Sequence, residues 1–188
     1  MRKNEGQLIR LLISAILLAI GMVLPLLLGQ VKVLGQAISP LHIPVFICGM
    51  TCGPVYGAAM GFVLPLLRSA VFGMPPIIPT GLAMAFELCA YGALTGVLYP
   101  MLRRRAGGAK ASGLPAMLVS LLIAMVLGRL VGGAAQAIIL GFNGKGYTFQ
   151  AFVASYFVGT AVGAVIHLIV VPAVVLALEK AKLSPMKG

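Results

Sequence analysis

Long apolar runs, separated by proline, glycine and charged residues, make up most of this chain. The runs are close to the ~20 residues that a helix needs to cross the hydrocarbon core of a bilayer. The pattern predicts six spans, near residues 8–28, 41–57, 58–74, 80–101, 114–140 and 150–178. The last two exceed the thickness of the bilayer and must therefore tilt or protrude. We expect an all-α membrane protein in which six transmembrane helices form one compact bundle over residues 1–188.

The second and third spans are separated by the sequence Cys52-Gly53-Pro54. Proline cannot continue a helix without losing a backbone hydrogen bond, so a short connection is expected there instead of one long helix.

Composition places the chain among membrane proteins. Its mean hydropathy is +1.10 and 9% of its residues are charged, whereas soluble domains are ~25% charged. A chain of this length that holds six spans leaves no room for a soluble catalytic domain. The net charge of +11 does not indicate nucleic-acid binding, because the basic residues lie at the ends of the spans.

The basic residues also predict an orientation. Six spans place ten Lys and Arg residues on the side of the two termini and two on the other side. Because cytoplasmic loops carry the excess of Lys and Arg, both termini are expected in the cytoplasm. The basic start of the chain and the apolar run after it are interpreted as a retained first helix, since no small-residue cleavage site stands out.

The motifs of several enzyme classes are missing from the sequence. There is no Walker A motif and no aspartate, so the chain is not expected to hydrolyse ATP or to need a cofactor. The three cysteines lie within apolar runs, and Cys48-x3-Cys52 lacks an accompanying histidine. They are interpreted as small packing residues, not as disulfides or metal ligands.

Polar residues within the spans are the main candidates for function, because an ionisable group in a membrane usually marks a site. The rise of 1.5 Å per residue places them in the outer half of the bundle. These candidate substrate-binding residues are His42, Arg68, Glu87, Tyr91, Arg129, Gln136 and Asn143. The same counting places His167 in the inner half, where it is interpreted as a hydrogen-bonding residue between helices.

Glu87 is the single interior carboxylate of the sequence, since Glu5 and Glu179 lie near the ends. Arg68 and Glu87 either form a structural ion pair between the third and fourth spans or both face a ligand. In the first case Arg129 has no carboxylate partner. The surplus positive charge then favours an anionic or strongly polar ligand.

Several short motifs follow one another along the chain. They are Leu41-His42-Ile43-Pro44-Val45, Cys52-Gly53-Pro54-x-Tyr56-Gly57, Pro65-Leu66-Leu67-Arg68-Ser69, Gly73-Met74-Pro75-Pro76 and Met84-Ala85-Phe86-Glu87-Leu88. In this order and spacing they resemble the substrate-binding S components of energy-coupling factor (ECF) transporters. The resemblance covers nearly the whole chain and includes the small-residue pair Ala15-x-x-x-Ala19 in the first span.

The resemblance implies a function, a set of partners and a location. The chain would capture a water-soluble vitamin or precursor outside the prokaryotic plasma membrane. Ala15 and Ala19 would dock it onto a transmembrane coupling protein that two cytoplasmic ATPases drive. The whole subunit would then topple in the lipid bilayer to release its ligand inside.

The substrate and the mechanism stay open at this point. Two interior arginines against one glutamate favour a carboxylate vitamin such as pantothenate, while pyridoxine, a pyrimidine precursor, riboflavin or a corrinoid fragment remain alternatives. The main rival is a stand-alone proton-coupled secondary transporter that uses Glu87. A structural subunit that binds no ligand is the other.

Overall fold

The computed structural model describes residues 3–28, 39–107, 113–144 and 146–181. Within these ranges the chain is helical and contains no strand. The elements are α1 (Lys3–Leu28), α3 (His42–Cys52), α4 (Pro54–Phe72), the π-helix η1 (Ile77–Gly81), α5 (Leu82–Arg105), α6 (Leu114–Phe142), α7 (Phe149–Val153), the π-helix η3 (Ala154–Val158) and α8 (Ala161–Lys180). The described part thus agrees with the predicted all-α fold.

Five stretches in the described ranges are long and apolar enough to cross a membrane, and α3, with 11 residues, is shorter. The expected connection at Cys52-Gly53-Pro54 is confirmed, because α3 ends at Cys52 and α4 begins at Pro54, whereas the predicted bounds at residues 57 and 58 were wrong. Gly53 has a φ of 100°, a left-handed conformation that glycine adopts easily. Pro54 then starts α4, where its missing N–H costs no helical hydrogen bond.

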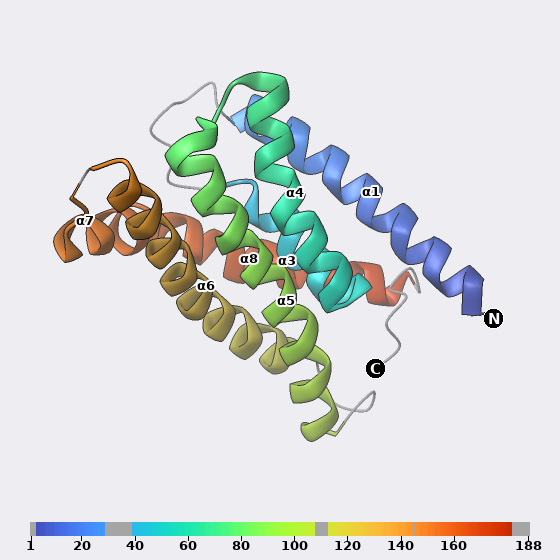
Figure 1. The fold of residues 1–188 in the computed structure, drawn as a ribbon. Helices are drawn as coiled ribbons and strands as arrows, with labels where there is room; N and C mark the ends of the chain where they lie inside the picture. Colours follow the sequence, from blue (N-terminus) through green and yellow to red (C-terminus); the bar gives the residue numbers. More distant parts are fainter. Residues whose placement is uncertain (1–2, 29–38, 108–112, 145, 182–188) are drawn as a thin grey trace.

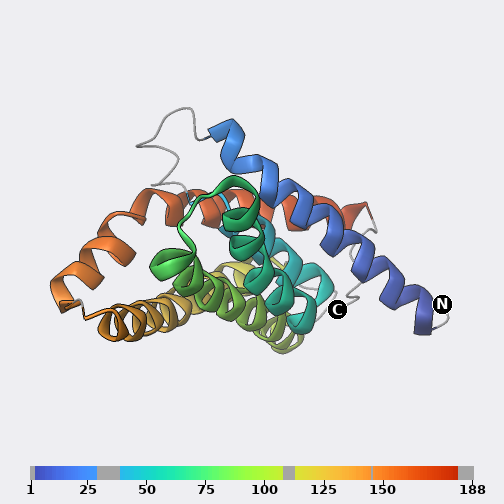
Figure 2. The same cartoon turned by 45° about the horizontal axis from the view of Figure 1, so that its top comes forward.

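Helix α3 forms the centre of the bundle and is buried along almost its whole length. It contacts α1, α4, α5 and α8, and α5 in turn packs between α4 and α6. Figures 1 and 2 show α1 along the outside of this group. Most large side chains of α1 are exposed and apolar, as expected for a helix that faces lipid or a partner.

Glycines allow the central helices to approach one another closely. A Cβ atom on Gly92 of α5 would meet the backbone of Gly57 in α4, and one on Gly61 would meet the backbone of Leu88. A Cβ on Gly96 would lie 2.5 Å from the backbone nitrogen of Pro54. Close backbone approach of this kind is what holds helices together in lipid, where no hydrophobic force drives their association.

The start of α1, the end of α5 and the end of α8 lie toward the same end of the bundle (Figures 1 and 2). At this end Arg103 Nη1 donates to Glu179 Oε1 and, at 2.8 Å, to the hydroxyl of Tyr99. The Tyr99 hydroxyl donates to the same carboxylate oxygen at 2.6 Å. These contacts, here called the inner cluster (Tyr99, Arg103 and Glu179), join α5 to α8.

Candidate functional site

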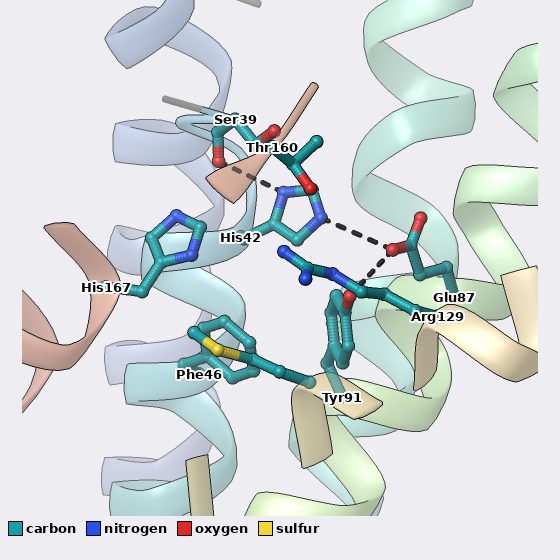
Figure 3. A pocket seen from close by; sticks show the side chains of 9 residues that line it. Ser39, His42, Phe46, Glu87, Tyr91, Arg129, Thr160 and His167 are labelled. Atoms are coloured by element: carbon teal, nitrogen blue, oxygen red, sulfur yellow. Dashed lines mark hydrogen bonds and ion pairs between the residues drawn. The ribbon is translucent and has the colours of Figure 1, made fainter. Parts of the chain in front are cut away.

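A small polar cavity lies between α3, α5, α6 and the start of α8 (Figure 3). Its free volume is about 10 Å³, which is room for about one water molecule. The lining residues are Ser39, His42, Phe46, Glu87, Tyr91, Met125, Arg129, Thr160 and His167. Four of the seven predicted binding residues therefore surround one cavity, namely His42, Glu87, Tyr91 and Arg129.

Glu87 is buried in this cavity with two partners. Tyr91 lies one helical turn further along α5, and its hydroxyl donates to Glu87 Oε1 at 2.7 Å. This spacing of four residues places both side chains on the same face of the helix. Nε2 of His42 faces the same carboxylate oxygen from α3 at 3.8 Å. The carboxylate thus lies between α3 and α5 at the cavity.

Four rings form one wall of the cavity. His42 stacks on His167 with ring centroids 5.5 Å apart and an angle of 18° between the planes. Phe46 packs against Tyr91 at 4.9 Å and against His167 at 5.6 Å. An apolar ligand group would find packing surface here, whereas hydrogen-bonding groups line the other walls.

Arg129 reaches the cavity from α6, and Figure 3 shows its guanidinium between His42 and Tyr91. The guanidinium carbon lies 5.4 Å from the ring centre of Phe157 in η3, within cation–π range. No carboxylate within the described ranges, which contain all three glutamates of the chain, lies within 4.0 Å of Arg129. This cation is therefore available to a negatively charged group in the cavity.

Two glycines of α6 make room for the side chains from α5. A Cβ on Gly128 would overlap the ring of Tyr91, and one on Gly132 would lie 2.9 Å from Cβ of Glu87. The four-residue glycine spacing on α6, which in sequence reads as a helix-packing pattern, here accommodates the polar residues of the cavity.

Tyr147 lies in the connection before α7, outside the membrane-spanning helices. Burial is the main cause that raises the pKa of its phenol, and the charge of Glu87 raises the pKa further. The phenol therefore keeps its proton at neutral pH and can donate a hydrogen bond.

Arg68 does not line the cavity. Its Nη1 donates to the backbone oxygen of Met22 in α1 at 3.0 Å, and its guanidinium lies 5.2 Å from the ring centre of Phe72. Arg68 and Glu87 therefore have different partners, and Arg68 joins α4 to α1.

The remaining predicted residues also lie away from the cavity lining. Gln136 is half-buried on α6, and Asn143 is exposed at the end of α6, where its Nδ2 donates to the Ile139 carbonyl at 2.7 Å. Ala15 and Ala19 are exposed on α1. Ala19 borders an apolar groove on that helix together with Ile20, Val23, Leu24 and Leu27.

Two cavity residues of the last span were missed from the sequence. His167 was placed in the inner half because its depth was counted along one straight helix from residue 150. The structure instead contains a π-helix and a break at Gly159 and Thr160 before α8 begins. Thr160 and His167 both line the cavity as a result. In the sequence, the feature that could have identified His167 as a site residue is its ionisable side chain within an otherwise apolar run.

Comparison with known families gives one result that covers almost the whole chain. The family model described as "ECF transporter, substrate-specific component" matches residues 9–179. The chain belongs to this family. Searches of curated proteins and of solved structures each gave no match.

Family membership defines the role of the chain at a coarse level. A substrate-specific component of an ECF transporter is its substrate-binding subunit and not its ATPase. The family implies a small-molecule substrate and partnership with the ECF module, which consists of a transmembrane component and ATPases. It also agrees with the apolar helices, which make this a multi-pass membrane protein.

Proposed function

We propose that this substrate-specific component binds a small water-soluble vitamin or vitamin precursor with a carboxylate group, and that the cavity around Glu87 and Arg129 is its binding site. Pantothenate is the favoured substrate. The observation that carries the proposal is the cation of Arg129, which faces the cavity with no carboxylate of the described residues within 4.0 Å. A guanidinium binds a carboxylate through charge-assisted and often bidentate hydrogen bonds.

The size of the cavity supports a small substrate. With a free volume of about 10 Å³ the cavity must widen to admit any vitamin. Riboflavin and corrinoid fragments require a much larger displacement of the walls than pantothenate does. The break at Gly159 and Thr160 borders the cavity, and a change in backbone conformation there can widen it.

The proposed orientation has both termini in the cytoplasm and the cavity toward the outside of a prokaryotic plasma membrane. The asymmetry of ten basic residues against two supports it. The inner cluster then lies at the cytoplasmic end, where it closes α5 against α8.

The exposed side of α1 is the proposed docking surface for the transmembrane component of the ECF module. Ala15 and Ala19 are exposed there and small, which allows another helix to approach closely. We expect Ala15→Trp combined with Ala19→Trp to abolish ATP-driven uptake in the complete transporter and to leave substrate binding by the isolated chain unchanged.

A panel of vitamins in a thermal-shift assay on the purified chain tests the proposal. A ligand at 100 times its Kd adds about 2.7 kcal/mol of stability, so pantothenate is expected to raise the melting temperature clearly. Arg129→Gln should lose this shift, while Arg68→Gln, a second arginine within a span, should keep it. A shift with a vitamin that has no acidic group, unchanged in Arg129→Gln, would refute the carboxylate assignment.

The position of Glu87 in the cavity, 3.8 Å from His42, also favours one alternative, a stand-alone proton-coupled transporter. Such a transporter takes up substrate in vesicles that contain this chain alone, driven by a pH gradient, and loses this uptake in Glu87→Gln. Our proposal predicts no uptake without the ECF module and ATP.

A further inference from the structure

Ser39 precedes α3 and lines the cavity. Its carbonyl group determines which nitrogen of the His42 ring bears a hydrogen. Ser39 has a φ of 49°, in the left-handed region that a serine rarely adopts. Its carbonyl oxygen accepts from the backbone N–H of His42 at 3.1 Å and lies 3.0 Å from Nδ1 of the His42 ring. A carbonyl can only accept, so Nδ1 is the nitrogen that bears a hydrogen.

The other ring nitrogen then has a defined character. In a neutral imidazole with hydrogen on Nδ1, Nε2 is an acceptor. Nε2 of His42 faces Oε1 of Glu87 at 3.8 Å, a distance beyond a direct hydrogen bond. Oε1 itself already accepts from Tyr91 at 2.7 Å. Two acceptors therefore face each other across the cavity.

A charged His42 fits this geometry less well. An imidazolium nitrogen that donates to a carboxylate oxygen lies about 2.7–2.9 Å from it. Nε2 of His42 and Oε1 of Glu87 are 3.8 Å apart, so they do not form such a bond. The groups that face His42 are the Ser39 carbonyl, Glu87 and Tyr91 from α5, Arg129 from α6 and His167 from α8.

We propose that Nε2 of His42 and Oε1 of Glu87 form an acceptor pair that selects substrates with a hydroxyl or amino group. An amino nitrogen about 2.9 Å from each acceptor can donate to both, because their separation of 3.8 Å is the base of a triangle with such sides. A hydroxyl has one hydrogen and donates to one of the two acceptors. The free volume there accepts a group of about the size of one water molecule.

This inference rests on the proposed function and narrows it. A carboxylate on Arg129 and a hydroxyl or free amino group on the acceptor pair together describe a small hydroxy acid or amino acid. Pantothenate, with a carboxylate and two hydroxyl groups, belongs to this class. Substrates that carry the acid but lack the hydroxyl or amino group are expected to bind more weakly.

The sequence makes a direct test feasible, because His42 and His167 are the two histidines of the chain. The purified chain, labelled with nitrogen-15 histidine, is studied by NMR at neutral pH, and the spectrum of His42→Gln identifies the signals of His42. The expected result is a neutral ring with hydrogen on Nδ1 and none on Nε2. A ring with hydrogen on Nε2, neutral or charged, would overturn the acceptor pair.

Pantothenate is then added, and N-acetyl-β-alanine, which has the carboxylate and the amide but no hydroxyl, serves as the matched control. Pantothenate should move the Nε2 signal of His42 more than the control does, and His42→Phe should weaken pantothenate binding about tenfold or more. Equal effects of the two compounds on Nε2 would overturn the selection of a donor group. If neither compound binds, the substrate proposed above is wrong, and the ligand-free spectrum still decides whether the acceptor pair exists.

Discussion

The inner cluster and the cavity contain the same kinds of residue, but their charges are arranged differently. In the inner cluster Arg103 and Tyr99 both donate to Glu179, so cation, phenol and carboxylate satisfy one another. In the cavity Glu87 accepts from Tyr91, while Arg129 has no carboxylate of the described chain within 4.0 Å. The cation of the inner cluster is paired with a carboxylate, whereas the cation of the cavity is not.

We interpret this difference as a structural role for the inner cluster and a binding role for the cavity. Charged groups in a membrane protein are costly unless they pair. The inner cluster pairs within the chain and joins α5 to α8, so its loss should lower stability and leave binding intact. In our proposal Arg129 binds the substrate, so its loss should weaken binding and leave stability nearly unchanged.

The largest expected effect is that of Arg129→Gln on substrate affinity. Without the guanidinium the carboxylate of bound pantothenate loses its partner in a mostly buried site, at a cost of about 3 kcal/mol, or roughly 100-fold in Kd. Isothermal titration of the purified chain measures this. The free energy of unfolding without ligand should change little, and a large loss of stability would assign Arg129 a structural role instead.

Glu179→Gln should show the reverse pattern. It leaves Arg103 without its carboxylate in a site where both side chains are about 15% exposed, and we expect a loss of about 1–3 kcal/mol in the free energy of unfolding. Pantothenate affinity should stay within about twofold of the unchanged chain. Denaturation in detergent and titration on the same sample compare the two quantities, and a parallel fall in both would remove the distinction between the clusters.

Gly128→Ala tests whether the shape of the cavity depends on α6. The added Cβ overlaps the Tyr91 ring and must displace it, which disturbs its hydrogen bond to Glu87. We expect pantothenate affinity to fall about tenfold, since a hydrogen bond to a charged group contributes about 1.5–3 kcal/mol. Gly141→Ala is the matched control on the same helix, because nothing lies within 4 Å of a Cβ there; a similar loss in this control would point to a general effect on α6.

The smallest effects are expected at Gln136 and Asn143. Both are polar residues in the outer part of α6, but neither lines the cavity. Alanine at either position should change pantothenate affinity by less than about twofold, because surface substitutions away from a site have small effects. A tenfold loss in binding would show that the site extends beyond the cavity.

The sequence predicted the general fold because membrane helices are long apolar runs that end at charge, glycine and proline. Gly53 and Pro54 predicted the break that the structure contains, but the expected bounds ran on to residue 57 because the pattern of apolar residues continues through Cys52 and Val55. Because of this break, α3 ends at Cys52 and is only 11 residues long. Apolar patterns therefore located the helices better than their ends.

The cavity was predictable in part. Depth along the helices suggested the group that includes His42, Glu87 and Arg129, and the structure places these three around one cavity. Depth does not determine the direction in which a side chain points around its helix, so Arg68, at a similar depth, contacts α1 instead. His167 was missed because its depth was counted along one continuous helix, whereas the structure has a break before α8.

Titration with a pair of ligands tests the central claim, that Arg129 binds the carboxylate of the substrate, most directly. Pantothenate and its alcohol analogue, in which a CH₂OH group replaces the carboxylate, are titrated into the unchanged chain and into Arg129→Gln. The account predicts that the unchanged chain prefers pantothenate by roughly 100-fold and that Arg129→Gln loses nearly all of this preference. An equal preference for pantothenate in both proteins would contradict it.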